Sequence, residues 1–494
     1  MNRRDLCRFA LYGATATFLP EVGGIGLWSE ETGQSGTGAF RRLVHGNYNL
    51  EAQVEGRTCT VSFSGRTDWP VEAILEISEG RIRLTRKENE AMDVLKESTG
   101  TGGGPWKIRL LKQGDFFRYW VNDSSGWIEQ PLCAWASDEP VRSCEPFSGY
   151  VGVSAEQGDT VSWKITGLSW LPFPDEPIIA PGPDGTFREN QILVGGVLEH
   201  RGMYYMYFTG DRFGCEEGAG VREIGVAHST DLRHWTVEPE PLLRVGDKAS
   251  WEPTGIYCSG VTTTPDGRIA VMYAAQNFPN WGGFGIAFAD HPLGPFQKYE
   301  NNPVHKHPVA AHEFDLVQTG DSERRYLFFY AGLTLSPQRG PAGDRGYLMY
   351  SNDLIHWHPH EQNPVFGPET LDNWDAVHVR PRSLNKIGDT WYLWYEGANH
   401  WPPPESFHID RVESRSWWDT VGLARSKDLV NWEYHPDNPT LPGTGISKEH
   451  FDTLWVGWPR MFIKDGTGYV FYTGGRAIGL RTIPIRELTN WQTS

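Results

Sequence analysis

Short runs of aromatic and β-branched residues recur through the C-terminal part of the chain, each bounded by Gly, Asp or Asn. Such runs are typical of strands. Turn signals precede them, and an Asp-Gly pair between apolar runs, as at 266–267, predicts a hairpin. A second short apolar run follows each one, and no segment keeps a helical period. The pattern predicts consecutive antiparallel strands, the clearest at 203–208, 268–273, 325–330, 390–395 and 468–472.

A unit of the form Ser-x-Asp-Leu-x-x-Trp follows the second run at 229–235, 351–357 and 426–432. Weaker copies end at Phe296 and Trp491, so the terminal aromatic residues are spaced by 61, 61, 75 and 59 residues. A fixed period of this size indicates a repeat architecture. Roughly four strands per unit, repeated five times, predict a five-bladed β-propeller. We expect each Asp to cap a turn and each Trp to pack between blades.

Residues 40–172 show a different pattern, in which apolar and polar residues alternate, as at 48–54. Strands with this spacing predict a β-sandwich. Together with a Gly-Tyr-Val-Gly-Val strand at 149–153, the domain resembles the concanavalin- and laminin-G-like jelly rolls often appended to carbohydrate enzymes. A Pro-rich segment, 171–177, separates it from the propeller at 177–494. The predicted fold class is therefore all-β, with a sandwich followed by a propeller.

The first thirty residues have the character of a targeting segment. The pair Arg3-Arg4 precedes a modest run of small apolar residues, which resembles a twin-arginine export signal. We therefore expect residues 1–30 to be an export signal and the protein to be periplasmic or secreted, the alternative being a frayed, weakly basic start. No later stretch is apolar enough and long enough to span a bilayer.

The amino-acid composition limits the classes of molecule that we expect the protein to bind. The formal net charge is -17, and an acidic chain repels phosphate backbones, so nucleic acid is not an expected partner. The 22 Trp, 19 Tyr and 23 Phe suit an all-β protein and also a sugar binder, since flat rings stack on sugar faces. Of six Cys, Cys7 would leave with the signal and Cys133–Cys144 is the disulfide that spacing favours. No Cys-x-x-Cys pair is present, so no zinc site is expected.

Acidic residues stand just before or early in each predicted first strand of a blade. Propeller topology brings residues that enter first strands and leave second strands around one central funnel. Like charges held close together raise one another's pKa, which supplies the protonated acid and the second carboxylate of glycoside hydrolysis. The alternative is that these carboxylates only cap strand ends or hold Arg380 and Arg460 in place. The candidate carboxylates are Glu189, Glu252, Asp315, Asp375 and Asp452, and the expected sugar-binding residues are Asp211, His312, His378, Arg380, Glu396, Trp458 and Arg460.

Residues 225–235 read Gly-Val-Ala-His-Ser-Thr-Asp-Leu-Arg-His-Trp, which resembles a motif of the five-bladed invertase and fructanase family, glycoside hydrolase family 32. The resemblance covers roughly residues 180 to 494 and implies a propeller glycosidase. Asp315 falls where that family has a transition-state carboxylate, and Asp375 falls where it has the acid/base Glu. The family's Asn-Asp-Pro-Asn-Gly nucleophile motif is absent, Glu189 being the nearest carboxylate, so fructose specificity is not implied.

The sequence thus predicts an exported glycosidase that cleaves an oligo- or polysaccharide at a chain end. Asp375 is the expected general acid, Glu189 or Asp452 the nucleophile or base, and Asp315 and Glu252 supporting carboxylates. Retention and inversion both stay open. No cofactor is required, although a structural calcium ion would suit the channel, and oligomeric state is open. Two alternatives remain: a non-catalytic glycan-binding protein on a degenerate scaffold, and phosphorolysis, for which arginines would bind the phosphate.

Overall fold

The structure is a computed structural model in which nearly every described element is a strand; the one helix among the described residues is α1 (Ile485–Thr489). It contains, within those residues, no helix long and apolar enough to cross a membrane. Residues 1–29 of the predicted export signal and Cys144 of the predicted disulfide lie outside them. The described residues are 30–35, 39–45, 48–65, 71–78, 81–88, 91–98, 105–113, 116–123, 126–134, 148–156, 159–166, 176–212, 221–277, 280–307, 311–334, 343–368, 375, 378–398, 420–435, 438–441, 451–452 and 456–490.

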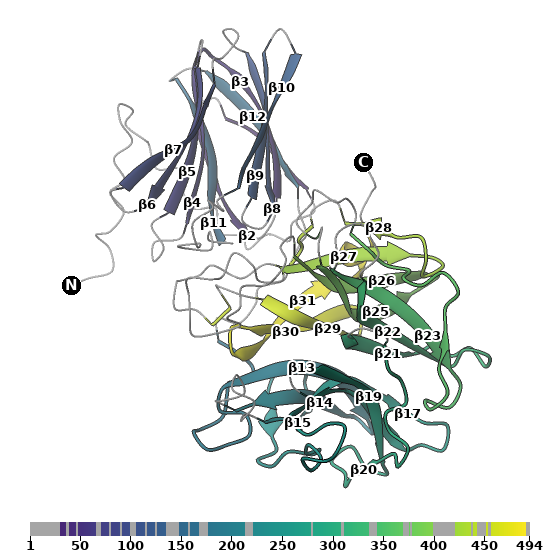
Figure 1. Cartoon of the computed structure of the whole chain (residues 1–494). Helices are drawn as coiled ribbons and strands as arrows, with labels where there is room; N and C mark the ends of the chain where they lie inside the picture. The colour runs from purple at the N-terminus through teal and green to yellow at the C-terminus, as the bar shows by residue number, and fades with distance from the viewer. Residues whose placement is uncertain are drawn as a thin grey trace.

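The N-terminal strands form two six-stranded antiparallel sheets, which face each other in Figure 1. The first sheet has the order β1 (Glu30–Ser35), β12 (Thr160–Thr166), β3 (Tyr48–Glu55), β8 (Trp106–Gln113), β9 (Phe116–Asp123) and β10 (Gly126–Ala134). The second has the order β2 (Ala39–His45), β11 (Ser148–Ala155), β4 (Cys59–Gly65), β5 (Val71–Ser78), β6 (Arg81–Glu88) and β7 (Ala91–Ser98).

Alternation along the strands builds a shared core between these two sheets. In β3 the even-numbered Leu50, Ala52 and Val54 are buried while their odd-numbered neighbours are exposed, as period-two patterning requires. They pack with side chains of the facing sheet such as Phe63. Cys59 lies in the same core as a free thiol whose pKa burial raises to about 12. The sandwich begins earlier than the predicted boundary at residue 40, because β1 pairs with β12 along its whole length.

The C-terminal strands form five blades of antiparallel strands, as the repeat predicted, and one parallel pair, Arg222 with Gly255, joins blades 1 and 2 into a single eight-stranded sheet. Blade 1 comprises β13 (Gln191–His200), β14 (Met203–Asp211), β15 (Arg222–Ser229) and β16 (Thr236–Val237). Blade 2 comprises β17 (Gly255–Thr263), β18 (Ile269–Asn277), β19 (Asn280–Ala289) and β20 (Gln297–Lys298). Blade 3 comprises β21 (Ala311–Gln318), β22 (Tyr326–Thr334), β23 (Gly343–Ser351) and β24 (His358–Pro359). Blade 4 comprises β25 (His378–Ile387), β26 (Thr390–Ala398), β27 (Thr420–Ser426) and β28 (Glu433–Tyr434). Blade 5 comprises β29 (Val456–Lys464), β30 (Thr467–Gly474) and β31 (Ala477–Pro484).

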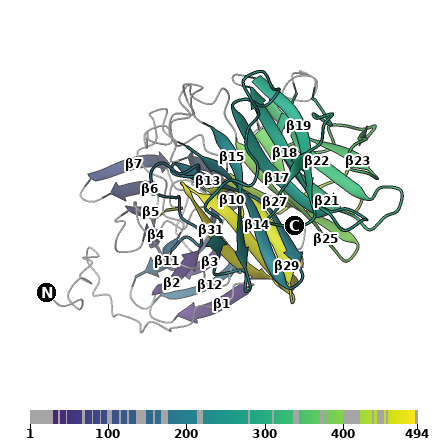
Figure 2. The same ribbon diagram turned by 90° about the horizontal axis from the view of Figure 1, so that it is seen from below.

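The blades close into a ring. First strands contact one another in the cyclic order β13, β17, β21, β25, β29 and back to β13. Figure 1 shows β29 and β30 of the last blade beside β13 of the first, and Figure 2 shows blades 2 and 3 side by side. In the first four blades the third strand forms a bridge with the segment that follows it, for example Val421 with Leu441. In the last blade Ile478 bridges instead to Ile179, so the segment before blade 1 completes blade 5.

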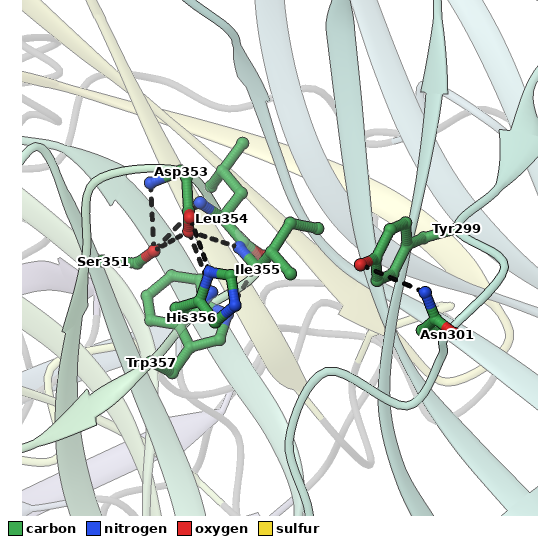
Figure 3. A network of polar contacts seen from close by, with 8 residues as sticks. All are labelled: Tyr299, Asn301, Ser351, Asp353, Leu354, Ile355, His356 and Trp357. Atoms are coloured by element: carbon green, nitrogen blue, oxygen red, sulfur yellow. Dashed lines mark hydrogen bonds and ion pairs between the residues drawn. The ribbon is translucent and has the colours of Figure 1, made fainter.

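The Ser-x-Asp-Leu unit forms the same turn in its three complete copies, as Figure 3 shows for blade 3. Asp353 Oδ1 accepts hydrogen bonds from the backbone N–H of Ile355 and His356, at 2.9 and 2.8 Å. Ser351 Oγ accepts the N–H of Leu354 at 2.9 Å, which lets the buried Leu354 adopt a positive φ of 68°. Equivalent bonds recur in blades 1 and 4. The predicted turn-capping role of the Asp is confirmed.

The Trp that ends each complete unit packs against aromatic side chains. Trp235 of blade 1 contacts Phe471 of blade 5 with ring centroids 5.7 Å apart, and Trp432 of blade 4 contacts Phe329 of blade 3 at 5.9 Å. The indole N–H groups of Trp235 and Trp357 donate to the Leu carbonyl of their own turn, at 3.2 and 3.1 Å. The predicted packing of these Trp residues between blades is confirmed for both pairs.

Candidate functional site

One end of the ring gathers the starts of the first strands and the ends of the second strands, and we call it the top face. The register pairs Gln191 with Asp211 in blade 1 and Val456 with Gly474 in blade 5. Every first strand has a β-bulge close to this end. Bulges re-aim side chains and are common next to functional sites. In blades 4 and 5 the bulges contain Arg382 and Trp458.

A row of four side chains from four blades crosses the ring centre at the top face. The Arg382 guanidinium lies 3.9 Å from the centroid of the Trp458 ring. The other neighbour of Trp458 is Tyr257, whose ring is nearly parallel, at 18° and a centroid distance of 6.2 Å. Arg222 follows, with its guanidinium 5.0 Å from the Tyr257 ring and a hydrogen bond to the Tyr257 hydroxyl. We call Arg222, Tyr257, Trp458 and Arg382 the central row.

A buried carboxylate holds each end of the central row. Glu396 is 1% exposed; it pairs with Arg382 Nη2 and accepts the backbone N–H of Trp458, so it links blade 4 to blade 5. Asp211 is 2% exposed and accepts Arg222 Nε at 3.0 Å. A buried charge is tolerated only when it is paired and hydrogen-bonded. Both ends of the row therefore have fixed geometry.

Trp458 has a strained backbone. Its φ is +54°, a left-handed value that is costly for a bulky side chain. Most of the other non-glycine residues with positive φ lie in hairpin turns or in the Ser-x-Asp-Leu turns, whereas Trp458 lies inside a strand. Strain of this kind persists where the surroundings over-determine it, and it clusters at functional sites. The bond from its N–H to Glu396 and the contact with Arg382 supply that restraint.

A second charged group lies between blades 3 and 4. Asp344 accepts Arg380 Nε at 2.7 Å and lies 2.9 Å from His378 Nδ1. Asp344 and His378 are each 3% exposed. Arg345, also buried, donates to the Asp344 carbonyl at 2.8 Å and feels the charge of Asp375. The predicted sugar-binding residues His378 and Arg380 thus meet at the top face through a carboxylate that the sequence did not single out.

Arg460 crosses the ring centre from blade 5. Its Nε donates to the Gly195 carbonyl at 3.1 Å and its Nη2 to the Phe314 carbonyl at 2.6 Å. Asp315 lies nearby and accepts the N–H of Leu384 at 2.7 Å and of Leu316 at 2.9 Å. Burial raises the pKa of Asp315, although Arg460 and these two N–H groups oppose the rise. A carboxyl with a raised pKa at a ring centre is suited to proton donation.

Three of the predicted catalytic carboxylates share one position in the repeat. Asp375 accepts the Tyr395 hydroxyl at 3.0 Å, and Asp452 accepts the Tyr472 hydroxyl at 2.7 Å and Arg481 Nη2 at 3.4 Å. Glu252 interacts in the same way with Tyr273 and pairs with Lys298. All three are at most 3% exposed. Each therefore lies against the second strand of its own blade, and not beside the other two as expected.

Glycines of the third strands make room for these tyrosines. A Cβ on Gly422 would lie 2.7 Å from the Tyr395 ring, and one on Gly479 would lie 2.3 Å from the Tyr472 ring. In blade 1 the aromatic Phe187 takes the place of the carboxylate, stacked on Phe208 at 6.1 Å. Because a side chain occupies this position against the second strand in several blades, we infer that its role is to pack the blade.

The remaining residues predicted from the sequence lie partly at the central row and partly elsewhere. Glu189 accepts the backbone N–H of Gly185, within the loop that precedes β13. The His312 side chain lies outside what the structure describes. Of the residues predicted from the sequence to bind sugar, Trp458 belongs to the central row, and Asp211 and Glu396 are the carboxylates that hold its ends.

Sequence reasoning missed Arg222, Tyr257, Arg382 and Asp344. Arg222 and Asp344 stand at or near the start of a third strand, a place the sequence reading did not consider. A search for charged residues at third-strand starts would have found both. Arg382 is a bulge residue, and a bulge has no sequence signal of its own here.

The described part of the chain contains no group of three or more His, Cys, Asp or Glu side chains arranged to hold a metal ion. The expected structural calcium ion stays a prediction. The described groups at the top face are carboxylates, guanidinium groups, a histidine and two aromatic rings.

Comparisons with known proteins place the fold. No family model matches the sequence, and no protein of curated function is similar to it in sequence. A candidate glycosidase from Bacteroides thetaiotaomicron superposes with a TM-score of 0.51 at 14% identity, covering 64% of this chain and 96% of that one. The β-1,2-mannobiose phosphorylase from Listeria innocua gives 0.49 at 14% identity, covering 64% and 97%. A thermostable family-43 glycoside hydrolase gives 0.43 at 16% identity, covering 60% and 91%.

The chain has a β-propeller fold, which it shares with the candidate glycosidase. At 14% identity the likeness shows the fold alone, and the resemblance to family 32 in particular stays a prediction.

Proposed function

We propose that this protein is a glycan-active enzyme that hydrolyses glycosidic bonds at the top face of the propeller. The observation that carries the proposal is the central row, in which four blades align two aromatic rings and two guanidinium groups, with a buried carboxylate at each end. Buried charge and backbone strain are costly to maintain, and they concentrate where a fold performs chemistry.

Asp315 is the residue we assign as general acid, because burial raises its pKa and it lies beside Arg460 at the ring centre. The second carboxylate that hydrolysis needs is assigned to Asp211 or Glu396, both of which lie at the central row. We assign structural roles to Glu189, Glu252, Asp375 and Asp452, since each has a partner in its own blade or loop. Action at a chain end and export remain part of the proposal, on the sequence arguments given above.

The test is release of reducing sugar from a panel of oligosaccharides and aryl glycosides. Asp315→Asn, Asp211→Asn and Glu396→Gln would be compared with wild type, each after a check of folding by thermal unfolding. Loss of a general acid lowers turnover about 10²- to 10⁴-fold. The matched control is Asp353→Asn, which removes a hydrogen-bonded carboxylate from a turn at the other end of blade 3 and should leave turnover unchanged.

Two alternatives predict different results. A glycan-binding protein on a degenerate scaffold would bind a glycan by calorimetry and release no sugar. A phosphorylase would release sugar 1-phosphate only when inorganic phosphate is added, so every assay is run with and without it. Turnover in water alone, lost in Asp315→Asn, would support hydrolysis.

A further inference from the structure

Backbone groups of two other blades anchor Arg460 at the ring centre. Its Nε donates to the Gly195 carbonyl of β13 at 3.1 Å, and its Nη2 donates to the Phe314 carbonyl of β21 at 2.6 Å. Gly195 lies within the bulge of β13, and a bulge leaves its extra residue outside the ladder. Both carbonyl groups are neutral, so these bonds fix the position of the guanidinium group without cancelling its charge.

Asp315 follows Phe314 directly, so the anchored guanidinium group and the carboxyl group lie beside the same stretch of β21. Asp315 is partly exposed, whereas Phe314 and Leu316 on either side of it are buried. Its oxygens accept the N–H groups of Leu316 and Leu384 at 2.9 and 2.7 Å. Burial nevertheless raises the pKa of Asp315. The carboxyl group thus lies deep in the ring and keeps some surface that a ligand can reach.

The groups that act on Asp315 come from the strands packed against β21. From β17 the facing residue is Gly260, where a Cβ would overlap the Leu316 side chain. From β25 it is the backbone N–H of Leu384, and from β29 it is Arg460. Burial has the largest effect and raises the pKa of Asp315, and Arg460 comes next and lowers it. Among the described residues, Arg460 is the charged group that opposes burial.

We propose that Arg460 is a positioning residue for the general acid, which sets the protonation of Asp315 and through it the pH range in which the enzyme is active. This inference rests on the proposed function and adds the regulation of the same site. A general acid must hold its proton in the bound state and release it in the transition state. Burial alone favours the protonated form, whereas a cation nearby favours release. Because arginine stays charged at every working pH, this bias is permanent.

The first test measures the protonation of Asp315 without any substrate. The free energy of unfolding in urea is measured from about pH 4 to 9 for wild type and for Asp315→Asn. Because the folded pKa of Asp315 is raised, the folded state keeps a proton that the unfolded state has lost. Wild type should therefore lose stability relative to Asp315→Asn as the pH rises from the unfolded value of about 3.9 through the folded pKa. The pH at which this difference levels off reports the folded pKa.

The second test changes Arg460 in both backgrounds. Arg460→Gln removes the charge and keeps N–H donors, whereas Arg460→Lys keeps the charge and loses the planar fork. A nearby opposite charge lowers the pKa of a carboxyl group by roughly 1–3. Arg460→Gln should therefore move the levelling pH, and the basic limb of kcat/KM that reports the free acid, upward by about one pH unit or more. Arg460→Lys should move both by less, and Arg460→Met replaces Arg460→Gln if that variant does not fold.

The matched control is Arg481→Gln. Arg481 is also a buried arginine of blade 5, and its Nη2 lies 3.4 Å from Asp452. Its loss should lower the free energy of unfolding, because it leaves the buried Asp452 with one cation fewer. The basic limb and the levelling pH of Asp315 should stay in place, which separates a general loss of stability from an effect on the acid.

The outcomes separate the inference from the proposed function. If Arg460→Gln lowered turnover or stability and moved neither pH, Arg460 would only brace the ring; the inference would be overturned and the glycosidase would stand. An equal movement in Arg460→Lys would assign the effect to the lost hydrogen bonds and overturn the role of the charge. Absence of turnover with every glycan would overturn the proposed function and with it the working pH range, while the unfolding curves would still decide whether Arg460 sets the protonation of Asp315.

Discussion

At the scale of single residues, the buried ion pair of Arg382 and Glu396 is the feature of the ring centre that depends most on keeping both partners. Both side chains are at most 1% exposed. Removing one partner of a buried pair costs about 3–5 kcal/mol, because the other charge is left in a low-dielectric interior. We expect Arg382→Leu and Glu396→Leu each to lower the free energy of unfolding in urea by about this amount, and the double variant to lose less than the two single losses together. Additive losses would show that the pair does not act as a unit.

His435 gives the molecule an acid-sensitive residue. Burial, and to a smaller extent Arg425, lower its pKa to about 3. In the unfolded chain the pKa of a histidine is about 6.5, so below that pH the unfolded state binds a proton that the folded state does not. The contribution of neutral His435 to the free energy of unfolding is therefore fully present above pH 6.5 and is lost as the pH falls towards 3. The loss is at most about 1.4 kcal/mol per pH unit. Urea unfolding between pH 7 and 4 should give a shallower decline in His435→Asn than in wild type, whereas replacing the exposed His358 in the same way should change nothing.

At the scale of elements, the Ser-x-Asp-Leu turn couples stability to pH through its carboxylate. Burial alone would raise the pKa of Asp353, but hydrogen bonds from the His356 ring and from backbone N–H groups outweigh it and bring the pKa to about 2. This depressed value stabilises the fold above pH 4 and is lost as pH falls towards 2. The Asp353 side chain is half exposed, so the effect is small. Asp353→Asn keeps an acceptor for the turn and should flatten the acid limb of the unfolding curve; an unchanged limb would rule out the coupling.

These turns and their strands were predictable because their determinants are local. The run 203–208 lies within β14, and the turn of Ser351, Asp353 and Leu354 uses only neighbours in sequence. The contacts that the acidic side chains make could not be predicted in the same way. Side chains alternate between faces along a strand, so a shift of one residue sends a carboxylate to the opposite side. Asp375 lies in a turn before β25, where even this alternation does not fix the direction of a side chain, and it meets Tyr395 of its own blade. The central row assembles residues that are far apart in sequence, such as Arg222 and Trp458.

At the scale of the whole molecule, a ring of blades is stable only if its two ends are joined. Here the join is a short segment outside the repeats: Ile178 N–H donates to the Ile478 carbonyl at 2.9 Å, and Ile478 N–H donates to the Ile179 carbonyl at 2.9 Å. Arg476 adds a bond from Nε to the Asn190 carbonyl at 2.6 Å across the same junction. The linker after the sandwich is thus also part of blade 5.

This closure predicts that Ile179 behaves as a core residue of the propeller. It is 3% exposed and occupies in blade 5 the bridging place that Leu441, 0% exposed, occupies in blade 4. Truncating a buried aliphatic side chain to Ala costs about 2–5 kcal/mol. In the full chain, Ile179→Ala and Leu441→Ala should therefore lower the midpoint of propeller unfolding by comparable amounts, measured by calorimetry, while Ile355→Ala in a partly exposed turn should lower it less. If Ile179→Ala left that midpoint unchanged while Leu441→Ala lowered it, the linker would be a tether only, and the ring would be held by β13 and β29 alone.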